Sequence, residues 1–260
     1  MFDVDKFKSL LDTQWMGREM LYHEELESTN SYLKQLSSEE LEHGVICFAD
    51  YQSKGRGQYE RNWESEPGAN LTFTLGFIPP KPERLHVLTL SLARAVVGLI
   101  ENDYGPESCI KWPNDVVANG RKMGGLLTEA IFNGNELDRV LVGIGLNINQ
   151  SSFPDELGRK ATSLRIELDQ QIDREKFLAA FMDRAEHAYN LWLENDQQLI
   201  LAINRKIIGY GRWVNIDVNG SEEMQRCKLL GVNEKGELVL IDEEAEVLTF
   251  SYEQIRIIPD

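Results

Sequence analysis

Ser53-Lys54-Gly55-Arg56-Gly57-Gln58 is the stretch from which the fold and chemistry of this 260-residue chain are best inferred. Its glycines let the backbone approach an anion closely, and its cationic side chains attract phosphate and carboxylate groups. A second segment, Lys111-Trp112-Pro113-Asn114-Asp115, precedes a further basic and glycine-containing one, Arg121-Lys122-Met123-Gly124-Gly125. Asp115 supplies a carboxylate of the kind that binds Mg²⁺. The three segments together predict a nucleotide-activating site.

Hydrophobic patterning places the first loop directly after a buried strand. Residues 44–51 contain an apolar run that ends at Asp50, and residues 71–77 alternate apolar with small polar side chains, so both segments predict strands. Apolar residues at three- and four-residue spacing predict an amphipathic helix over residues 83–102, lying on the sheet. Upstream, the side-chain oxygens of Ser28-Thr29-Asn30 predict a helix N-terminus.

The remaining sequence predicts more strands, a long helix and a separate group of short strands. Residues 110–112 predict a strand that enters the Pro-Asn-Asp turn. Residues 125–132 and 140–148 predict neighbouring strands joined at Asn133-Gly134-Asn135. An apolar stripe predicts a helix over residues 173–194, with Asp173 as its cap. Short strands are then expected at 214–218, 224–230, 238–241 and 247–250, with turns at Asn219-Gly220 and Lys235-Gly236, a spacing typical of a small β-barrel.

Composition excludes several classes of protein. The formal charge of −16 disfavours a nucleic-acid partner, because nonspecific affinity for nucleic acid comes from cationic contacts with phosphates. No segment approaches the roughly 18 consecutive apolar residues of a membrane span, and the N-terminus lacks the features of a signal peptide. A cytoplasmic protein is therefore expected. The three dispersed cysteines predict reduced thiols, and the scattered histidines disfavour a zinc site.

Two more motifs, Glu27-Ser28-Thr29-Asn30 and Gly143-Ile144-Gly145-Leu146-Asn147, complete a set of five. In their order and spacing, from about residue 24 to residue 150, these motifs resemble the biotin protein ligases. The resemblance implies an α+β fold of the class II aminoacyl-tRNA synthetase and biotin ligase type, a mixed sheet with flanking helices. It places the catalytic domain at residues 1–208 and a small SH3-like β-barrel at residues 209–260.

The resemblance also implies an activity. Biotin protein ligases join biotin to ATP with Mg²⁺, release pyrophosphate, and pass the biotinyl group from biotinyl-5′-AMP to a lysine of a biotin carboxyl carrier protein or domain. Because only 27 residues precede Ser28, we expect the short form of the family, without the winged-helix domain of the members that double as repressors. Family members often pair through sheet edges, so a homodimer is compatible with the sequence, which leaves the oligomeric state and the identity of the carboxylase open.

By the resemblance, the biotin-binding residues surround the ring and the carboxylate of biotin. Lys122 is expected to be a catalytic electrostatic clamp on the biotin carboxylate and the α-phosphate, and Arg56 to bridge the same two groups. Taken by itself, Lys122 would be a surface lysine in a turn, and the segments around it favour the catalytic role. For Ser28-Thr29-Asn30, binding is favoured over helix capping alone, and the two roles are compatible because the cap fixes these side chains. The full biotin-binding set is Ser28, Thr29, Asn30, Gln52, Gly55, Arg56, Gly57, Gln58, Lys122 and Gly125.

The ATP-binding residues are assigned in the same way. Trp63 is expected against adenine, although a core aromatic is the commoner fate of a tryptophan. Asp115 is expected to bind Mg²⁺ or to lie beside the ribose, although an Asx turn would explain Asn114-Asp115 as well. The full ATP-binding set is Arg56, Arg61, Trp63, Lys111, Asn114, Asp115, Lys122 and Asn147, of which Arg61 is also expected to be catalytic.

One position departs from the family loop. Glu60 stands where the family has glycine, which is costly if that position needs a positive φ and adds a carboxylate beside the phosphates. Two alternatives remain at this point: a lipoate-protein ligase or octanoyl transferase of the same fold, and a biotin-binding module that has lost transfer. A P-loop enzyme is disfavoured because the chain has no Gly-x-x-x-x-Gly-Lys-[Ser/Thr] motif.

Overall fold

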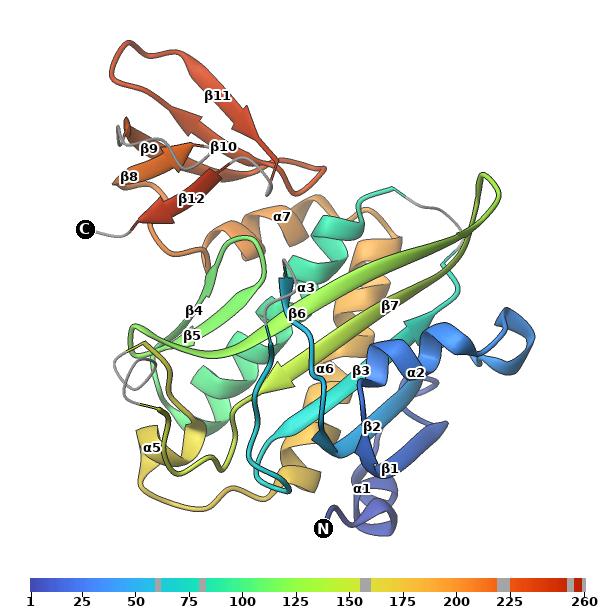
Figure 1. The fold of residues 1–260 in the computed structure, drawn as a ribbon. Coiled ribbons are helices and arrows are strands. Elements are labelled where there is room, and N and C mark those ends of the chain that lie inside the picture. The colour runs from blue at the N-terminus through green and yellow to red at the C-terminus, as the bar shows by residue number, and fades with distance from the viewer. Residues whose placement is uncertain (59–61, 80–82, 155–159, 219–224, 252–254, 259–260) are drawn as a thin grey trace.

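A seven-stranded mixed sheet forms the frame of the protein in the computed structural model (Figure 1). The structure describes residues 1–58, 62–79, 83–154, 160–218, 225–251 and 255–258. Among the strand pairs of this sheet, β1 and β2 run parallel and the others antiparallel. In spatial order the strands are β1 (Met20–Leu26), β2 (Val45–Gln52), β3 (Leu71–Phe77), β7 (Glu136–Leu146), β6 (Arg121–Asn133), β5 (Asp115–Ala118) and β4 (Ser108–Lys111).

The strands predicted around the motifs are confirmed, with two changes. The strand expected from residue 125 begins at Arg121, so Lys122 lies inside β6 rather than in a turn. The segment after the Pro-Asn-Asp turn is itself a strand, β5, which pairs with β4 and β6. The turn predicted at residues 133–135 joins β6 to β7. The edge strand β1 was not predicted from the sequence.

Helices cover both faces of this sheet. α3 (Leu85–Leu99) and α6 (Arg174–Leu193) pack together on one face, and α2 (Thr29–Gln35) lies on the other (Figure 1). α3 continues into a π-helical turn, Ile100–Tyr104, and Asp173 caps α6 through the backbone N–H of Lys176, as predicted. The shorter helices are α1 (Val4–Leu10), η1 (Ser38–Glu40), α5 (Leu164–Leu168) and α7 (Gln197–Asn204).

One helical segment of the described residues, Leu85–Tyr104, is long and apolar enough to cross a membrane, with a mean hydropathy of 1.3. Of the tested stretch, 67% is buried inside the fold, between the large sheet and α6. Burial of this kind is typical of the core helix of a globular domain. The apolar character of α3 is therefore explained by its place in the core.

The C-terminal strands form a second sheet of five antiparallel strands and confirm the predicted small β domain. Asn204 joins the two parts: its side chain accepts from the Val232 N–H at 2.7 Å and donates to the Val232 carbonyl at 3.2 Å. The turn at Lys235-Gly236 is present, while the one predicted at Asn219-Gly220 lies outside the described residues. The strands, in spatial order, are β11 (Val247–Phe250), β10 (Leu238–Ile241), β9 (Gln225–Val232), β8 (Trp213–Val218) and β12 (Ile255–Ile258), of which β12 was not predicted.

The three cysteines are free thiols, as expected. Burial raises the pKa of Cys47 to about 12 and, with smaller effects of nearby carboxylates, that of Cys109 to about 11. Burial also raises the pKa of Cys227. A thiolate is the reactive form of cysteine, so the raised pKa values disfavour a nucleophilic role for these residues.

Candidate functional site

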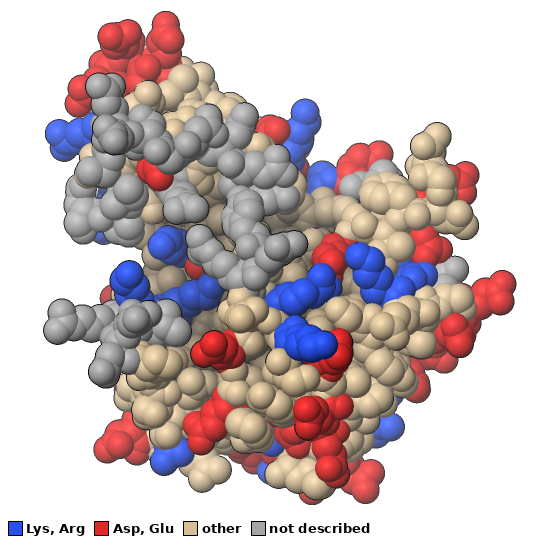
Figure 2. All heavy atoms as spheres, in the orientation of Figure 1, with Lys and Arg blue, Asp and Glu red and all other residues tan. Residues whose placement is uncertain are grey.

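A cavity of about 950 Å³ opens on the face of the large sheet opposite α3 and α6. This volume lies within the range of small-molecule sites in proteins. Figure 2 shows lysine and arginine side chains gathered across the middle of this face. Most of the predicted site residues line the cavity: Ser28, Thr29, Asn30, Gln52, Arg56, Gly57, Gln58, Trp63, Lys111, Asn114, Asp115, Lys122, Gly125 and Asn147.

Two glycines of β7 hollow the floor of this cavity. Gly143 and Gly145 are two residues apart and so point to the same face of the sheet. A Cβ at Gly143 would lie 2.3 Å from Oδ1 of Asn30, and a Cβ at Gly145 would lie 2.5 Å from Cε2 of Trp63. Any side chain at either position would displace Asn30 or Trp63 from the sheet. The Gly-x-Gly motif is thus explained by close approach of two side chains, one at each end of the cavity.

The polar end of the cavity is built on the first turn of α2. Ser28 caps this helix, since its hydroxyl accepts from the backbone N–H of Ser31 at 3.4 Å. Gln52, at the end of β2, accepts through Oε1 from the backbone N–H of Thr29 at 2.7 Å and from the Thr29 hydroxyl at 3.1 Å. The predicted capping role is confirmed, and the cap holds the same side chains at the cavity wall.

Thr74 extends this network and was not predicted as a site residue. Its buried hydroxyl donates to Oδ1 of Asn30 and lies 2.7 Å from Oγ1 of Thr29. The alternating sequence of β3 could have indicated this role, because Thr72 and Thr74 share one face of a strand whose other face is apolar. The hydroxyl of Thr72 donates to the Ala49 carbonyl at 2.7 Å, within the sheet, whereas that of Thr74 bonds to side chains of α2.

The glycine-basic loop folds back on itself at the mouth of the cavity. The backbone N–H of Trp63 donates to the carbonyl of Gly55 at 2.9 Å, and Arg56 forms a bridge with Asn62. Gly55, predicted to contact biotin, is buried beneath the loop and does not line the cavity. A Cβ there would lie 2.5 Å from the Trp63 carbonyl oxygen, so the glycine serves the hairpin itself.

Trp63 lies over the sheet with one polar atom unsatisfied. Its indole is half-buried, and the Nε1–H is buried without a hydrogen-bond partner in the structure as described. It lines the cavity and is not a core aromatic. The predictions for Glu60 and Arg61 fall outside the described residues.

The cationic end centres on Lys122. A β-bulge in the pairing of β5 with β6, where Val116 pairs with Gly124 and Val117 with Lys122, shifts the register by one residue. In a regular strand, Lys122 and Gly125 are three residues apart and would point to opposite faces of the sheet. The extra residue of the bulge places Lys122 on the same face as Gly125. Its ammonium group lies 2.7 Å from Oδ1 of Asp115, so the two predicted residues are brought together as an ion pair.

Three other predicted residues frame this end. Asn114 donates through Nδ2 to the Leu126 carbonyl at 2.6 Å, and buried Asn147 donates through Nδ2 to the Thr162 carbonyl at 3.1 Å. Both side chains hold neighbouring segments in place, and Lys111 is exposed at the cavity rim. A further cation lining the cavity, Lys160, was not predicted, because nothing in its local sequence distinguishes it from a surface lysine.

At this end of the cavity, Mg²⁺ would need ligands from the nucleotide as well as from the protein. No group of three or more His, Cys, Asp or Glu side chains that could hold a metal occurs among the described residues. Asp115 supplies one carboxylate at the cavity wall. Mg²⁺ is commonly bound by one or two carboxylates together with substrate phosphates and water. The donor set therefore fits a metal that arrives with ATP.

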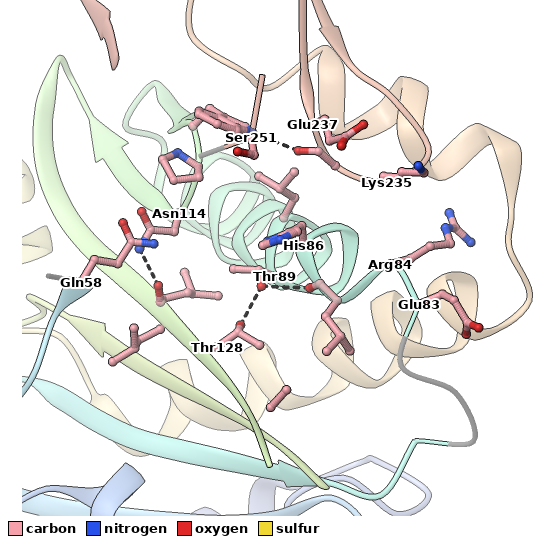
Figure 3. A pocket seen from close by; sticks show the side chains of 18 residues that line it. Gln58, Glu83, Arg84, His86, Thr89, Asn114, Thr128, Lys235, Glu237 and Ser251 are labelled. Carbon is pink, nitrogen blue, oxygen red and sulfur yellow. Dashed lines mark hydrogen bonds between the residues drawn. The ribbon is translucent and has the colours of Figure 1, made fainter. Parts of the chain in front are cut away.

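A second hollow of about 710 Å³ adjoins the cavity and reaches the C-terminal domain at Lys235, Glu237 and Ser251 (Figure 3). Thr89 of α3 and Thr128 of β6 meet in it, with their hydroxyls 2.6 Å apart. Trp112, which lines both hollows, donates its indole N–H to the carbonyl of Gly236 at 3.2 Å. The C-terminal domain thus borders the site region.

Comparisons with known proteins agree with this geometry. The model of the biotin/lipoate A/B protein ligase family matches residues 22–147, the part of the chain that supplies most of the residues lining the cavity. The bifunctional ligase/repressor BirA of Bacillus spizizenii is 33% identical over 238 residues, which cover 90% of this chain and 73% of that protein. The chain belongs to the biotin/lipoate A/B protein ligase family. The bifunctional ligase/repressor BirA of Bacillus subtilis has a higher identity, 40%, over a shorter aligned region of 167 residues, which covers 63% of this chain.

The overall fold of this family member also has a solved counterpart. Biotin protein ligase from Aquifex aeolicus, in complex with biotin and ATP, is 27% identical, with a TM-score of 0.81 over 94% of this chain and all of that one. The chain spans about half the length of the Bacillus subtilis relative, 51%. The predicted family, with its mixed sheet and flanking helices, is confirmed.

Proposed function

We propose that this chain is a biotin protein ligase. It activates biotin with ATP to biotinyl-5′-AMP, releasing pyrophosphate, and transfers the biotinyl group to a lysine of a biotin carboxyl carrier domain. The observation that carries the proposal is one cavity with two chemically different ends. A neutral hydrogen-bonding end, formed by Thr29, Asn30 and Gln52, is joined to an end that holds Arg56 and Lys122.

The neutral end suits a ring that carries both donors and acceptors. The amides of Asn30 and Gln52 and the hydroxyls of Ser28 and Thr29 offer both kinds of group within a small space. The ureido group of biotin has one carbonyl oxygen and two N–H groups. The alkyl chain of a lipoyl or octanoyl group has nothing to satisfy these side chains, which favours biotin within the family.

The cationic end suits two anions that must meet. In adenylation a carboxylate oxygen of biotin attacks the α-phosphorus of ATP, the bond to the β-phosphate oxygen breaks, and pyrophosphate leaves. Fixed cations lower this barrier by neutralising and aligning both anions. Arg56 and Lys122 are the cations proposed for this role, and Asp115 would hold Mg²⁺, which supplies further charge neutralisation when it is bound.

Transfer requires an acceptor lysine to reach the adenylate. Its neutral ε-amine attacks the biotinyl carbonyl carbon, AMP leaves with the electrons of the C–O bond, and the amine loses a proton. The acceptor is proposed to be the carrier domain of a carboxylase such as acetyl-CoA carboxylase. A cytoplasmic location, which rests on the composition of the sequence, and a homodimer, which rests on the family resemblance, are further parts of the proposal.

The test is incubation of the purified protein with ATP, Mg²⁺, biotin and a carrier domain, with lipoate in a parallel reaction. The acceptor is expected to gain the mass of one biotinyl group only when ATP is present. Gain with lipoate alone would move the chain to the lipoate branch of the family. Pyrophosphate release with no acceptor gain would instead favour a module that has lost transfer.

A further inference from the structure

Glu129 of β6 lies beside the cavity without being one of its predicted residues. One oxygen of its carboxylate, Oε2, accepts from Nδ2 of Asn30 at 2.7 Å and from Nη2 of Arg56 at 3.2 Å. The other oxygen lies 3.7 Å from the ammonium group of Lys34. The side chain is 22% exposed and is thus held between the ring end and the cationic loop.

The orientation of the Asn30 amide depends on this carboxylate. Asn30 is buried above Gly143, and Oδ1 accepts from the hydroxyl of Thr74. A hydroxyl can donate or accept, so Thr74 would tolerate either orientation of the amide. A carboxylate only accepts, so the reversed amide would place its oxygen against the oxygens of Glu129. Among these partners, Glu129 alone distinguishes the two orientations.

The fixed orientation decides what Asn30 can offer a ligand. One N–H of the amide is used by Glu129 and the oxygen by Thr74, which leaves the second N–H for the cavity that Asn30 lines. We propose that Glu129 is a positioning residue that holds Asn30 as a hydrogen-bond donor to the ring carbonyl oxygen of the ligand. Glu129 thereby sets the preference for a ureido group over an analogue that carries a hydrogen-bond donor in place of the ring carbonyl oxygen. This inference rests on the proposed function.

The test variant is Glu129→Gln, which keeps the size of the side chain but can donate as well as accept. The affinity of the protein for biotin and for 2-iminobiotin, in which a nitrogen replaces the ring carbonyl oxygen, is measured by calorimetry. We expect biotin to bind about tenfold more weakly, the difference between a charged and a neutral acceptor. The ratio of the two affinities should move towards 2-iminobiotin.

Glu27→Gln is the matched control. It removes the same charge beside the same loop, because Glu27 pairs with Lys54 at 2.7 Å, and both side chains are exposed and line neither hollow. Its biotin affinity should stay within about twofold of the wild type, since exposed ion pairs contribute little. Thermal unfolding of both variants is recorded alongside.

Two results would overturn the inference while leaving the proposed function intact. One is an unchanged affinity and ratio in Glu129→Gln. The other is an equal loss for both ligands together with a fall in melting temperature beyond that of the control, which would mark Glu129 as a structural residue only. If the wild-type protein itself binds no biotin, the proposed function fails and this inference with it.

Discussion

Replacing Gly143 with alanine tests the site at its most constrained point. The new Cβ would lie 2.3 Å from Oδ1 of Asn30, where ordinary contacts begin at 3.4 Å, so a shift of about one ångström is needed. Asn30 is 4% exposed and bonded to Thr74 and Glu129, so it cannot move without losing these bonds. Losing one such buried bond costs about 1–3 kcal/mol, which corresponds to a rise of about 5- to 150-fold in the KM for biotin.

The same change two residues later should act on the other substrate. A Cβ at Gly145 would lie 2.5 Å from Cε2 of Trp63 and would lift the indole off the sheet. Since Trp63 is the proposed adenine contact, Gly145→Ala should raise the KM for ATP more than that for biotin. Overpacking of this kind also destabilises the fold, by about 1–3 kcal/mol for either variant.

The assay is pyrophosphate release as a function of each substrate, with melting temperatures measured in parallel. Gly98→Ala is the control, because a Cβ at this helical position would meet no atom within 4 Å beyond its chain neighbours and the nearby backbone of its own helix, and alanine favours a helix. Gly98→Ala should keep both KM values. A biotin KM in Gly143→Ala within twofold of the wild type would refute the placement of Asn30 at the ring. A rise in the ATP KM alone would refute the assignment of the two ends.

Three further outcomes follow from single contacts. Lys122→Ala should lose about 10²-fold or more in pyrophosphate release, yet stay within about 1 kcal/mol of wild-type stability, because its ion pair is partly exposed; near-normal release would exclude it from the mechanism. Burial raises the pKa of Asp50, but hydrogen bonds, including one from Arg174 at 2.8 Å, lower it on balance. Stability should therefore fall below about pH 4 in urea titrations, and a flat profile would contradict this. Trp112→Phe should lose its bond to Gly236 and about 1 kcal/mol of unfolding free energy, measured in the same titrations.

The motif-bearing part of the fold could be predicted from the sequence because those segments carry strong local signals. The apolar run of β2 and the alternation of β3 belong to strands with at least one buried face. β1 escaped prediction because its sequence, Met20–Leu26, holds histidine and two glutamates, as an edge strand with solvent on one side can. β5 was not predicted, because the segment after the Pro-Asn-Asp turn is only four residues long and is a strand through its pairing with two neighbours.

The site residues that were missed also depend on contacts between segments far apart in the sequence. Most of the residues predicted from their positions in the family motifs line the cavity, and these include Lys122 and Asp115, which form an ion pair. Glu129 was missed because a charged residue in the outer half of a strand is normally solvent-facing. It becomes part of the site only when α2 crosses the sheet and places Asn30 over it. The bulge that turns Lys122 into the cavity is likewise a property of pairing and leaves no local pattern in the sequence.

The two ends of the cavity differ in how firmly they are held, and this difference has a chemical consequence. The polar end is fixed by buried and partly buried hydrogen bonds among α2, β2 and β3, so it can select a ring before any reaction occurs. At the cationic end, Arg56 and Lys122 are occupied by Glu129 and Asp115 in partly exposed ion pairs. Such pairs contribute about 0–1 kcal/mol, so ligand oxygens can replace the carboxylates at little cost. Substitutions at the polar end should therefore change the affinity for biotin, and those at the cationic end the rate of adenylation.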